Sequence, residues 1–368
     1  MTGCQDDTRS WRTDGEQHIW KAGNKGQSAY FTTINRNKQS VTLDLKHPKG
    51  REILLQLARG ADVVIDNFIP GKMEELGIGY EQLSGVNPSV IHASISGYGK
   101  TGPYSRRAGY DAIAAAEGGL LHITGEPDGR PMRPGLGLTD MCTGLYMHGA
   151  ILAALRARDE SGQGQQIDTS LFETQVSLLT NVAMSWLNGG QKARRWGTGH
   201  PSIVPYGCFR TADSYLVVGA VNDRQFARLC RLLGQERLAR DPRFVDNDAR
   251  VRNRAALDGI VDGLLSAQKT ERWLQVFEGS GMPYGPVNSM EQVFSHPQTA
   301  ARGMVHTIQD ESAMSGQVQV LGIPVKFGHD RPSIRSKAPG LGEHTASVLA
   351  ELGYDAEAIS QLRRDGVV

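Results

Sequence analysis

Apolar and polar positions along the first half of the chain predict strands that alternate with helices. Residues 41–45 alternate with a period of two, while 62–66 and 89–96 form apolar runs typical of buried strands. Pro48 suits the first turn of a helix and Gly60 ends its apolar stripe, so a helix is expected between the first two strands. Further helices are expected at 112–121, 141–156 and 171–187. This alternation favours a largely parallel sheet.

Two loops follow predicted strands and contain Gly, Pro and polar residues, at 67–72 and 97–107. Ligands of parallel α/β sheets bind outside the carboxyl ends of the strands. Binding groups are therefore expected in these two loops.

The pattern changes near residue 191, where a basic, Gly-rich stretch reads KARRWGTGHPS. Beyond it a strand is expected at 214–221, followed by helices at 226–233, 255–265 and 271–277. The tail contains a short strand near 317–321 and a helix from about residue 345 that ends at Gly353.

These elements predict an α/β fold class, with a Rossmann-like parallel sheet in a large domain and a smaller α+β domain. The predicted organisation is a large domain at 1–190, a linker with a Gly-rich loop at 191–204, a small domain at 205–305 and a C-terminal segment at 306–368 that returns to the large domain.

Composition excludes several classes of function. The 368 residues include 39% hydrophobic and 21% charged residues, and the formal net charge is +1 with both signs interspersed. No basic stripe indicates nucleic acid or an anionic membrane, and no apolar run is as long as a membrane span. The four cysteines and ten histidines show no metal-ligand spacing, so no metal is expected.

Common catalytic motifs are also missing. Gly99, Lys100 and Thr101 follow a strand as in a phosphate-binding loop, but that motif requires Gly at position 94, where this chain has Ser94. Neither a GxSxG nucleophile elbow nor an HExxH zinc helix occurs.

One carboxylate stands out at the end of the Pro/Gly-rich stretch MRPGLGLTD, which closes on Asp140 just before an apolar-striped helix. At the start of a helix, backbone N–H groups and the macrodipole favour the anionic form of a carboxylate. Such a carboxylate can cap the helix or attack an activated carbonyl. The residues alone favour capping for Asp140, and favour a plain connector for the Gly-rich turn at 197–200.

Several segments in fixed order resemble the class III CoA-transferase family of the CaiB/BaiF type, and the match covers essentially the whole chain. These segments are Asp6–Trp11, Ala29–Lys38, Asp62–Gly71, Ile95–Pro103, Ala108–Gly119, Gly135–Gly144 and Leu341–Thr345. Within the family, Arg195–Tyr206 and Glu278–Asn288 look most similar to mitochondrial members that use succinyl-CoA and glutarate.

The resemblance implies a nucleophilic role for Asp140. Its carboxylate would attack an acyl-CoA thioester, giving an aspartyl anhydride and then an aspartyl-CoA thioester. N–H groups at the helix start would stabilise the oxyanion. The loop containing Gly197, Gly199 and His200 would shield these intermediates from water. The partners would be an acyl-CoA and a small free carboxylic acid, with no permanently bound cofactor. An interlocked homodimer is implied, in the mitochondrion or alternatively the cytoplasm.

Residues that bind CoA or line the site in relatives carry over to Tyr30, Asn67, Phe68, Tyr110 and Asp111. Glu75 stands where some relatives have a CoA-binding Arg. The cations that remain for the phosphates are Arg36, Lys38, Lys72 and Arg106. Arg194 or Arg195 is expected to hold the far carboxylate of a dicarboxylate acceptor.

Two other activities are weighed against transfer. A related 2-methylacyl-CoA racemase needs a His in an AGHD-like turn, where this chain has Tyr110 in AGYD, so racemisation is disfavoured. The other is a non-catalytic CoA-binding protein. Relatives begin with an additional strand–helix unit of about 35 residues. The chain opens just after it, so poor expression or weak CoA binding is expected.

Overall fold

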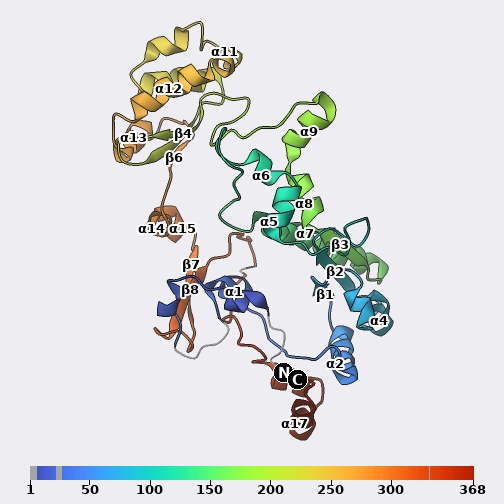
Figure 1. Ribbon diagram of the computed structural model, residues 1–368. Coiled ribbons are helices and arrows are strands. Elements are labelled where there is room, and N and C mark those ends of the chain that lie inside the picture. Colours follow the sequence, from blue (N-terminus) through green and yellow to red (C-terminus); the bar gives the residue numbers. More distant parts are fainter. Residues whose placement is uncertain (1–5, 22–26, 331) are drawn as a thin grey trace.

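The computed structural model describes residues 6–21, 27–330 and 332–368, so Cys4 lies outside the described residues. The predicted α/β class is confirmed. A three-stranded parallel sheet forms one body, and two antiparallel sheets lie in separate bodies (Figure 1). No helix within the described ranges is long and apolar enough to cross a membrane.

The parallel sheet has the order β1–β2–β3, with β1 at Val63–Asp66, β2 at Ile91–Ser96 and β3 at Gln166–Ser170. Central β2 is almost entirely buried, as its apolar run predicts. The sequence analysis missed β3 because its residues are mostly polar, and Gln166 and Asp168 are exposed. The carboxyl ends of all three strands meet at one edge.

Helices around this sheet are α2 (Pro48–Arg59), α3 (Lys72–Glu75), α4 (Tyr80–Val86), α5 (Asp111–Glu117), α6 (Leu120–Ile123), α7 (Leu138–Ser161), α8 (Leu171–Leu178) and α9 (Thr180–Gly189). Each of the helices predicted at 112–121 and 171–187 is in fact two helices. The breaks coincide with positive φ angles, 88° at Gly119 and 45° at Thr180. Helix α7 begins three residues earlier than predicted, so Asp140 lies inside its first turn.

The prediction of a strand at 41–45 is wrong. This extended segment pairs with no strand among the described residues. Instead, the Asp44 N–H donates to the Val367 carbonyl (2.8 Å), and the Thr42 N–H donates to the Thr345 hydroxyl (3.0 Å). Helices α16 (Thr345–Glu351) and α17 (Ala356–Arg364) then pack against α2 through Leu349, Leu362 and Ile53.

The small lobe surrounds an antiparallel sheet of β4 (Tyr206–Arg210), β5 (Tyr215–Gly219) and β6 (Tyr284–Pro286). Its helices are α10 (Asp223–Leu232), α11 (Asn247–Arg252), α12 (Arg254–Leu265) and α13 (Thr270–Phe277), with a 3-10 helix η3 (Glu236–Arg240). Their amphipathic faces enclose one apolar core that includes Phe226, Phe244 and Phe277. Figure 1 shows this lobe apart from the parallel sheet, joined by long connections.

A third body contains the hairpin of β7 (Val305–Gln309) and β8 (Gln317–Leu321), with α1 (Ala29–Asn35) beside it in Figure 1. The short elements η1 (Asp7–Ser10), η2 (Glu16–His18), α14 (Met290–Ser295) and α15 (Pro297–Ala301) complete the chain. The buried Trp20 packs against Val318 and Val320 here. This body therefore joins segments nearly 300 residues apart in the sequence.

Candidate active site

The start of α7 places two carboxylates together. Asp140 is exposed in the first turn, and Asp111 approaches from the start of α5. Asp111 Oδ1 accepts hydrogen bonds from the backbone N–H groups of Thr139 (2.9 Å) and Asp140 (3.3 Å). Asp111 therefore caps α7 from another helix, which leaves the Asp140 side chain free of that role.

Two glycines bring Asp111 to this position. A Cβ built on Gly97 would lie 2.7 Å from the Gly109 Cα, and one built on Gly109 would lie 2.6 Å from the Gly97 Cα. Any larger residue would separate the end of β2 from the turn that leads into α5. Both glycines belong to motifs that carry the family resemblance, although their contact is visible only in three dimensions.

Thr139 is also held through its side chain. Its hydroxyl donates to Oε1 of Gln175 on α8 (2.9 Å), and both side chains are fully buried. The sequence analysis missed this pair, because a buried Thr–Gln bond between two helices has no local pattern. The bond fixes the first turn of α7, and with it the position of Asp140.

Partial desolvation of the carboxylate by the surrounding protein, and then the nearby charge of Asp111, raise the pKa of Asp140. The pKa of Asp140 is thus shifted upward, whereas the helix start alone would shift it downward. Both carboxylates flank Gly137, where an added Cβ would lie 3.5 Å from Asp140 Oδ2 and 3.6 Å from Asp111 Oδ1. A raised pKa makes the ionised carboxylate a stronger base, which suits a nucleophile.

The N–H groups of the first turn are already engaged. Besides the two that Asp111 accepts, the Leu138 N–H donates to Leu136 (2.9 Å) and the Met141 N–H to Gly137 (3.1 Å). The expected oxyanion stabilisation by this helix start is therefore not available in this conformation. Any oxyanion donor has to come from another element.

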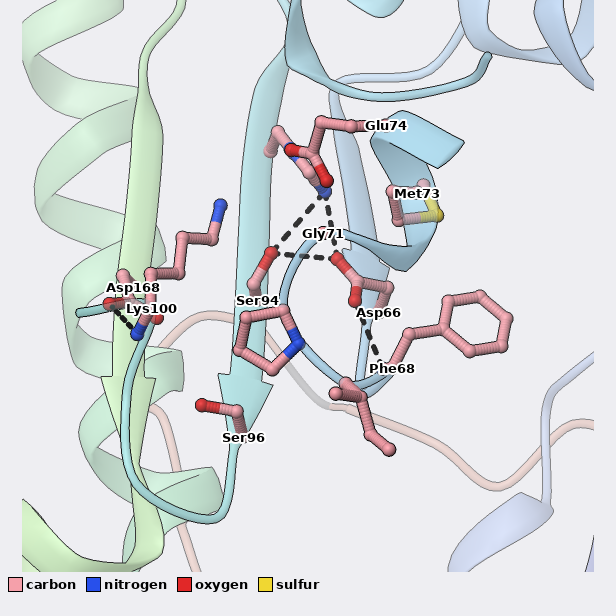
Figure 2. A pocket seen from close by; sticks show the side chains of 12 residues that line it. Asp66, Phe68, Gly71, Met73, Glu74, Ser94, Ser96, Lys100 and Asp168 are labelled. Carbon is pink, nitrogen blue, oxygen red and sulfur yellow. Dashed lines mark hydrogen bonds and ion pairs between the residues drawn. The ribbon is translucent and has the colours of Figure 1, made fainter. Parts of the chain in front are cut away.

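A shallow pocket lies at the carboxyl edge of the parallel sheet (Figure 2). Residues 68–71 after β1 line one side with an apolar surface that Met73 extends, and Lys100 lines it from the loop after β2. Both loops singled out by the sequence thus contribute to one pocket. Phe68 and Asn67 are both exposed, but only Phe68 lines the pocket.

Buried polar side chains form the base of this pocket. Asp66 Oδ2 lies 2.8 Å from His92 Nε2 and 2.7 Å from the Ser94 hydroxyl, which is 3.4 Å from the same His92 nitrogen. A hydrolytic triad needs the carboxylate and the serine on different imidazole nitrogens. These residues therefore have the composition of a triad without its geometry.

The Gly-rich loop lies elsewhere, at the base of the small lobe. The Gly197 N–H donates to the Gly125 carbonyl (3.0 Å), and the His200 ring stacks on Tyr206 at 5.6 Å between centroids. The loop borders a cavity of about 550 Å³ that neither Asp111 nor Asp140 lines. One chain does not bring the shielding loop and the nucleophile into one cavity.

The remaining predicted residues are dispersed. Tyr30 is exposed on α1 and contacts the edge of Trp11 at 5.4 Å between centroids, and Tyr110 is exposed just before α5. Among the ranges described, no cluster of His, Cys, Asp and Glu could hold a metal ion.

Most of the predicted phosphate cations are engaged. Arg36 donates to the Leu321 carbonyl, Lys38 to Asn35 and Lys72 to Glu75. Arg106 has no ion-pair partner among the described residues, and neither has Lys100, which the sequence analysis did not select for this role. Lys100 lies in the loop that follows β2, four residues after the strand ends, and that position was the available signal.

Comparison with known proteins agrees with this architecture. The model of CoA-transferase family III matches residues 3–345, and the chain belongs to that family. It is accordingly a family III CoA-transferase enzyme. The chain is 43% identical to the succinyl-CoA:glutarate CoA-transferase of Homo sapiens, across all of this chain and 82% of that protein.

Two further relatives extend the comparison. An acyl-CoA transferase of Fusarium pseudograminearum is 52% identical across all of this chain and 80% of its own length. The crystal structure of a CAIB/BAIF family protein from Brucella suis superposes with a TM-score of 0.82 at 40% identity, covering 94% of this chain and 89% of that chain.

Proposed function

We propose that this enzyme transfers CoA from succinyl-CoA to glutarate through covalent intermediates on Asp140. The observation that carries the proposal is the exposed Asp140 carboxylate in the first turn of α7, relieved of capping by Asp111. The choice of substrates is supported by relatives of Mus musculus and Homo sapiens that are 44% and 43% identical and are named succinyl-CoA:glutarate CoA-transferase.

The reaction balances without an added cofactor. An Asp140 oxygen attacks the thioester carbonyl of succinyl-CoA, the C–S bond breaks, and a mixed anhydride and CoA thiolate form. The thiolate attacks the aspartyl carbonyl, so succinate leaves and an aspartyl-CoA thioester remains. A glutarate carboxylate repeats the first step on that thioester, and the thiolate then attacks the glutaryl carbonyl. Glutaryl-CoA leaves and the Asp140 carboxylate is regenerated.

We assign the nucleotide end of CoA to the surface around the shallow pocket at the edge of the parallel sheet. Phe68 and Ile69 are exposed and offer an apolar surface for a purine ring, and Lys100 offers an ammonium group without an ion-pair partner in the described chain. Lys100 therefore replaces the engaged cations as the candidate phosphate ligand. Lys100→Gln is expected to weaken CoA binding in calorimetry, while Lys192→Gln, in the exposed linker, serves as the control.

For the distal carboxylate of the acceptor, the structure favours Arg194 over Arg195. The Arg195 guanidinium donates to the carbonyls of Glu126 (3.1 Å) and His122 (3.3 Å), so it anchors the loop. Arg194 is exposed and only stacks on Trp196, at 3.8 Å from the ring centroid. Arg194→Gln is expected to raise the KM for glutarate without changing that for succinyl-CoA. An unchanged KM for glutarate would remove Arg194 from the proposal.

A homodimer completes this proposal, because the nucleophile and the Gly-rich loop do not share a cavity in one chain. Helix α7 exposes Leu145 (68%), and α9 exposes Trp186 (55%) and Leu187 (73%). Large apolar side chains this exposed are typical of a surface that another chain covers. Sedimentation equilibrium is expected to give twice the chain mass, and a monomer mass would contradict the dimer. The mitochondrial location stays a prediction from the resemblance.

The deciding experiment is a transfer assay with succinyl-CoA and free glutarate, in which glutaryl-CoA is detected by mass spectrometry. Asp140→Asn is expected to abolish the product. Asp159→Asn, an exposed carboxylate at the other end of α7, is the matched control and is expected to retain activity. Without acceptor, the wild-type protein should gain a CoA adduct at Asp140. Full activity of Asp140→Asn would refute the covalent role.

A further inference from the structure

A single buried carboxylate connects two strands of the sheet to the turn that borders the nucleotide pocket. Asp66, the last residue of β1, uses both of its oxygens in hydrogen bonds. Oδ1 accepts from the backbone N–H of Phe68 (3.0 Å), and Oδ2 accepts from His92 (2.8 Å) and Ser94 (2.7 Å). Figure 2 shows Asp66 between Ser94 on β2 and the turn that carries Phe68.

The strand register produces this arrangement. Asp66 is paired with Ser94 in the parallel ladder, and His92 lies two residues before Ser94 on the same face of β2. The His92 side chain is 1% exposed and that of Asp66 is 8% exposed. The environment of Asp66 is therefore set by the register of the sheet.

The surroundings of the imidazole leave it little freedom. Its ring stacks on Tyr80 at 6.3 Å between centroids, and its other nitrogen lies 3.5 Å from the Gln166 amide on β3. Burial raises the pKa of Asp66, but the hydrogen bonds from His92, Ser94 and the Phe68 N–H outweigh it, so the pKa lies below its ordinary value. Asp66 consequently stays an ionised acceptor for all three donors.

The bond to the Phe68 N–H sets the course of the chain directly after β1. A carboxylate that accepts from the N–H two residues later closes a local turn. That turn leads into Gly71, whose φ of 90° directs the chain into α3. Among the described residues, this bond is the only hydrogen bond that ties residues 67–70 to a buried side chain.

We propose that Asp66, held by His92 and Ser94, is a positioning residue that fixes the turn at 67–71 for the nucleotide end of CoA. The inference rests on the proposed function, since it assumes that this pocket receives CoA. It assigns Asp66 no part in the chemistry at Asp140. Its effect belongs to the affinity for CoA and its esters, and the affinity for the free acid is independent of it.

The sharpest variant is Asp66→Asn. An amide has one acceptor oxygen, so it can serve either the Phe68 N–H or the His92–Ser94 pair, but not both. Loss of one charge-assisted hydrogen bond predicts about a tenfold weaker binding of CoA. Asp62→Asn is the matched control, because Asp62 immediately precedes β1 at its opposite end and is an exposed partner of Arg158. Ser94→Ala removes one donor, keeps the Phe68 bond, and is expected to weaken CoA binding by only about twofold.

The test combines calorimetry with free coenzyme A and steady-state kinetics on the full chain. For Asp66→Asn, the Kd for CoA and the KM for succinyl-CoA should rise together, while kcat and the KM for glutarate stay at the wild-type values. A general structural defect would instead lower kcat and the melting temperature. Equal Kd values for wild type, Asp66→Asn and Asp62→Asn would overturn the inference.

The outcome separates this inference from the proposed function. If the wild-type chain does not bind CoA, the proposed function fails before any variant is compared. If the wild type binds CoA and Asp66→Asn binds it equally well, only the positioning role fails. If Asp66→Asn does not fold, Ser94→Ala decides the question, and a Kd for CoA unchanged in that variant overturns the role.

Discussion

Replacing Asp111 tests how the two carboxylates divide their tasks at the start of α7. Asp111→Asn keeps an oxygen that can accept from the Thr139 and Asp140 N–H groups, but removes the negative charge next to Asp140. Asp111→Ala removes both the charge and the cap. The two variants therefore separate the electrostatic effect of Asp111 from its structural effect.

The geometry gives the size of each effect. Because both carboxylates lie within 3.6 Å of one point beside Gly137, their nearest oxygens are no more than about 7 Å apart. At that distance, two unit charges repel by on the order of 0.6 kcal/mol even with the dielectric constant of water. Loss of the charge from the helix start costs about 0.3–1 kcal/mol. These effects nearly cancel in Asp111→Asn, whereas Asp111→Ala also loses the cap, for about 1 kcal/mol.

Two measurements check this reasoning. Thermal melting should leave Asp111→Asn close to wild type and lower the Tm of Asp111→Ala by about 2 °C. Since Asp111 raises the pKa of Asp140, the acid limb of kcat/KM for succinyl-CoA should move to lower pH in Asp111→Asn. Gly149→Ala on the same helix, where an added Cβ meets nothing within 4 Å, controls for nonspecific effects. An unmoved acid limb together with an unchanged Tm of Asp111→Ala would refute both assigned roles.

Three further predictions follow from individual contacts. The raised pKa of Asp140 means that its ionisation costs folding stability above the ordinary carboxyl pKa, so Asp140→Asn should melt slightly higher than wild type at pH 7, with a difference that shrinks towards pH 4 in calorimetry. Gly97→Ala should lower both Tm and transfer activity, because its Cβ would lie 2.7 Å from the Gly109 Cα. Gly263→Ala on α12, where an added Cβ meets nothing within 4 Å, should instead raise the free energy of unfolding by about 0.5–1 kcal/mol. Burial raises the pKa of Cys230 to about 11, so iodoacetamide at pH 8 should leave Cys230 unlabelled in the native protein and label it after unfolding; rapid native labelling by peptide mass spectrometry would contradict this.

The local pattern of residues was sufficient for much of the fold. The apolar runs predicted β1 and β2 correctly, and the amphipathic spacing predicted α10, α12 and α13. The sequence analysis did not predict the polar strands β3 and β7, because strand formation there depends on neighbours in the sheet. The prediction of a strand at 41–45 was wrong for the converse reason. It has the alternation of a strand, but its hydrogen bonds go to the C-terminal residues Thr345 and Val367.

For the candidate site too, some features could be predicted from the sequence and others only from the tertiary structure. Sequence by itself drew attention to Asp140 and to the loops after β1 and β2, because a carboxylate at a helix start and loops at strand ends are local features. The residues alone favoured capping for Asp140, and only the family resemblance implied a nucleophile. Tertiary structure alone decided that Asp111, which lies 29 residues earlier, takes over the cap and raises the pKa of Asp140. It also joined Asp66 to His92 and Ser94 across two strands. These contacts depend on strand register and on the close approach of Gly97 and Gly109, which no local pattern of side chains specifies.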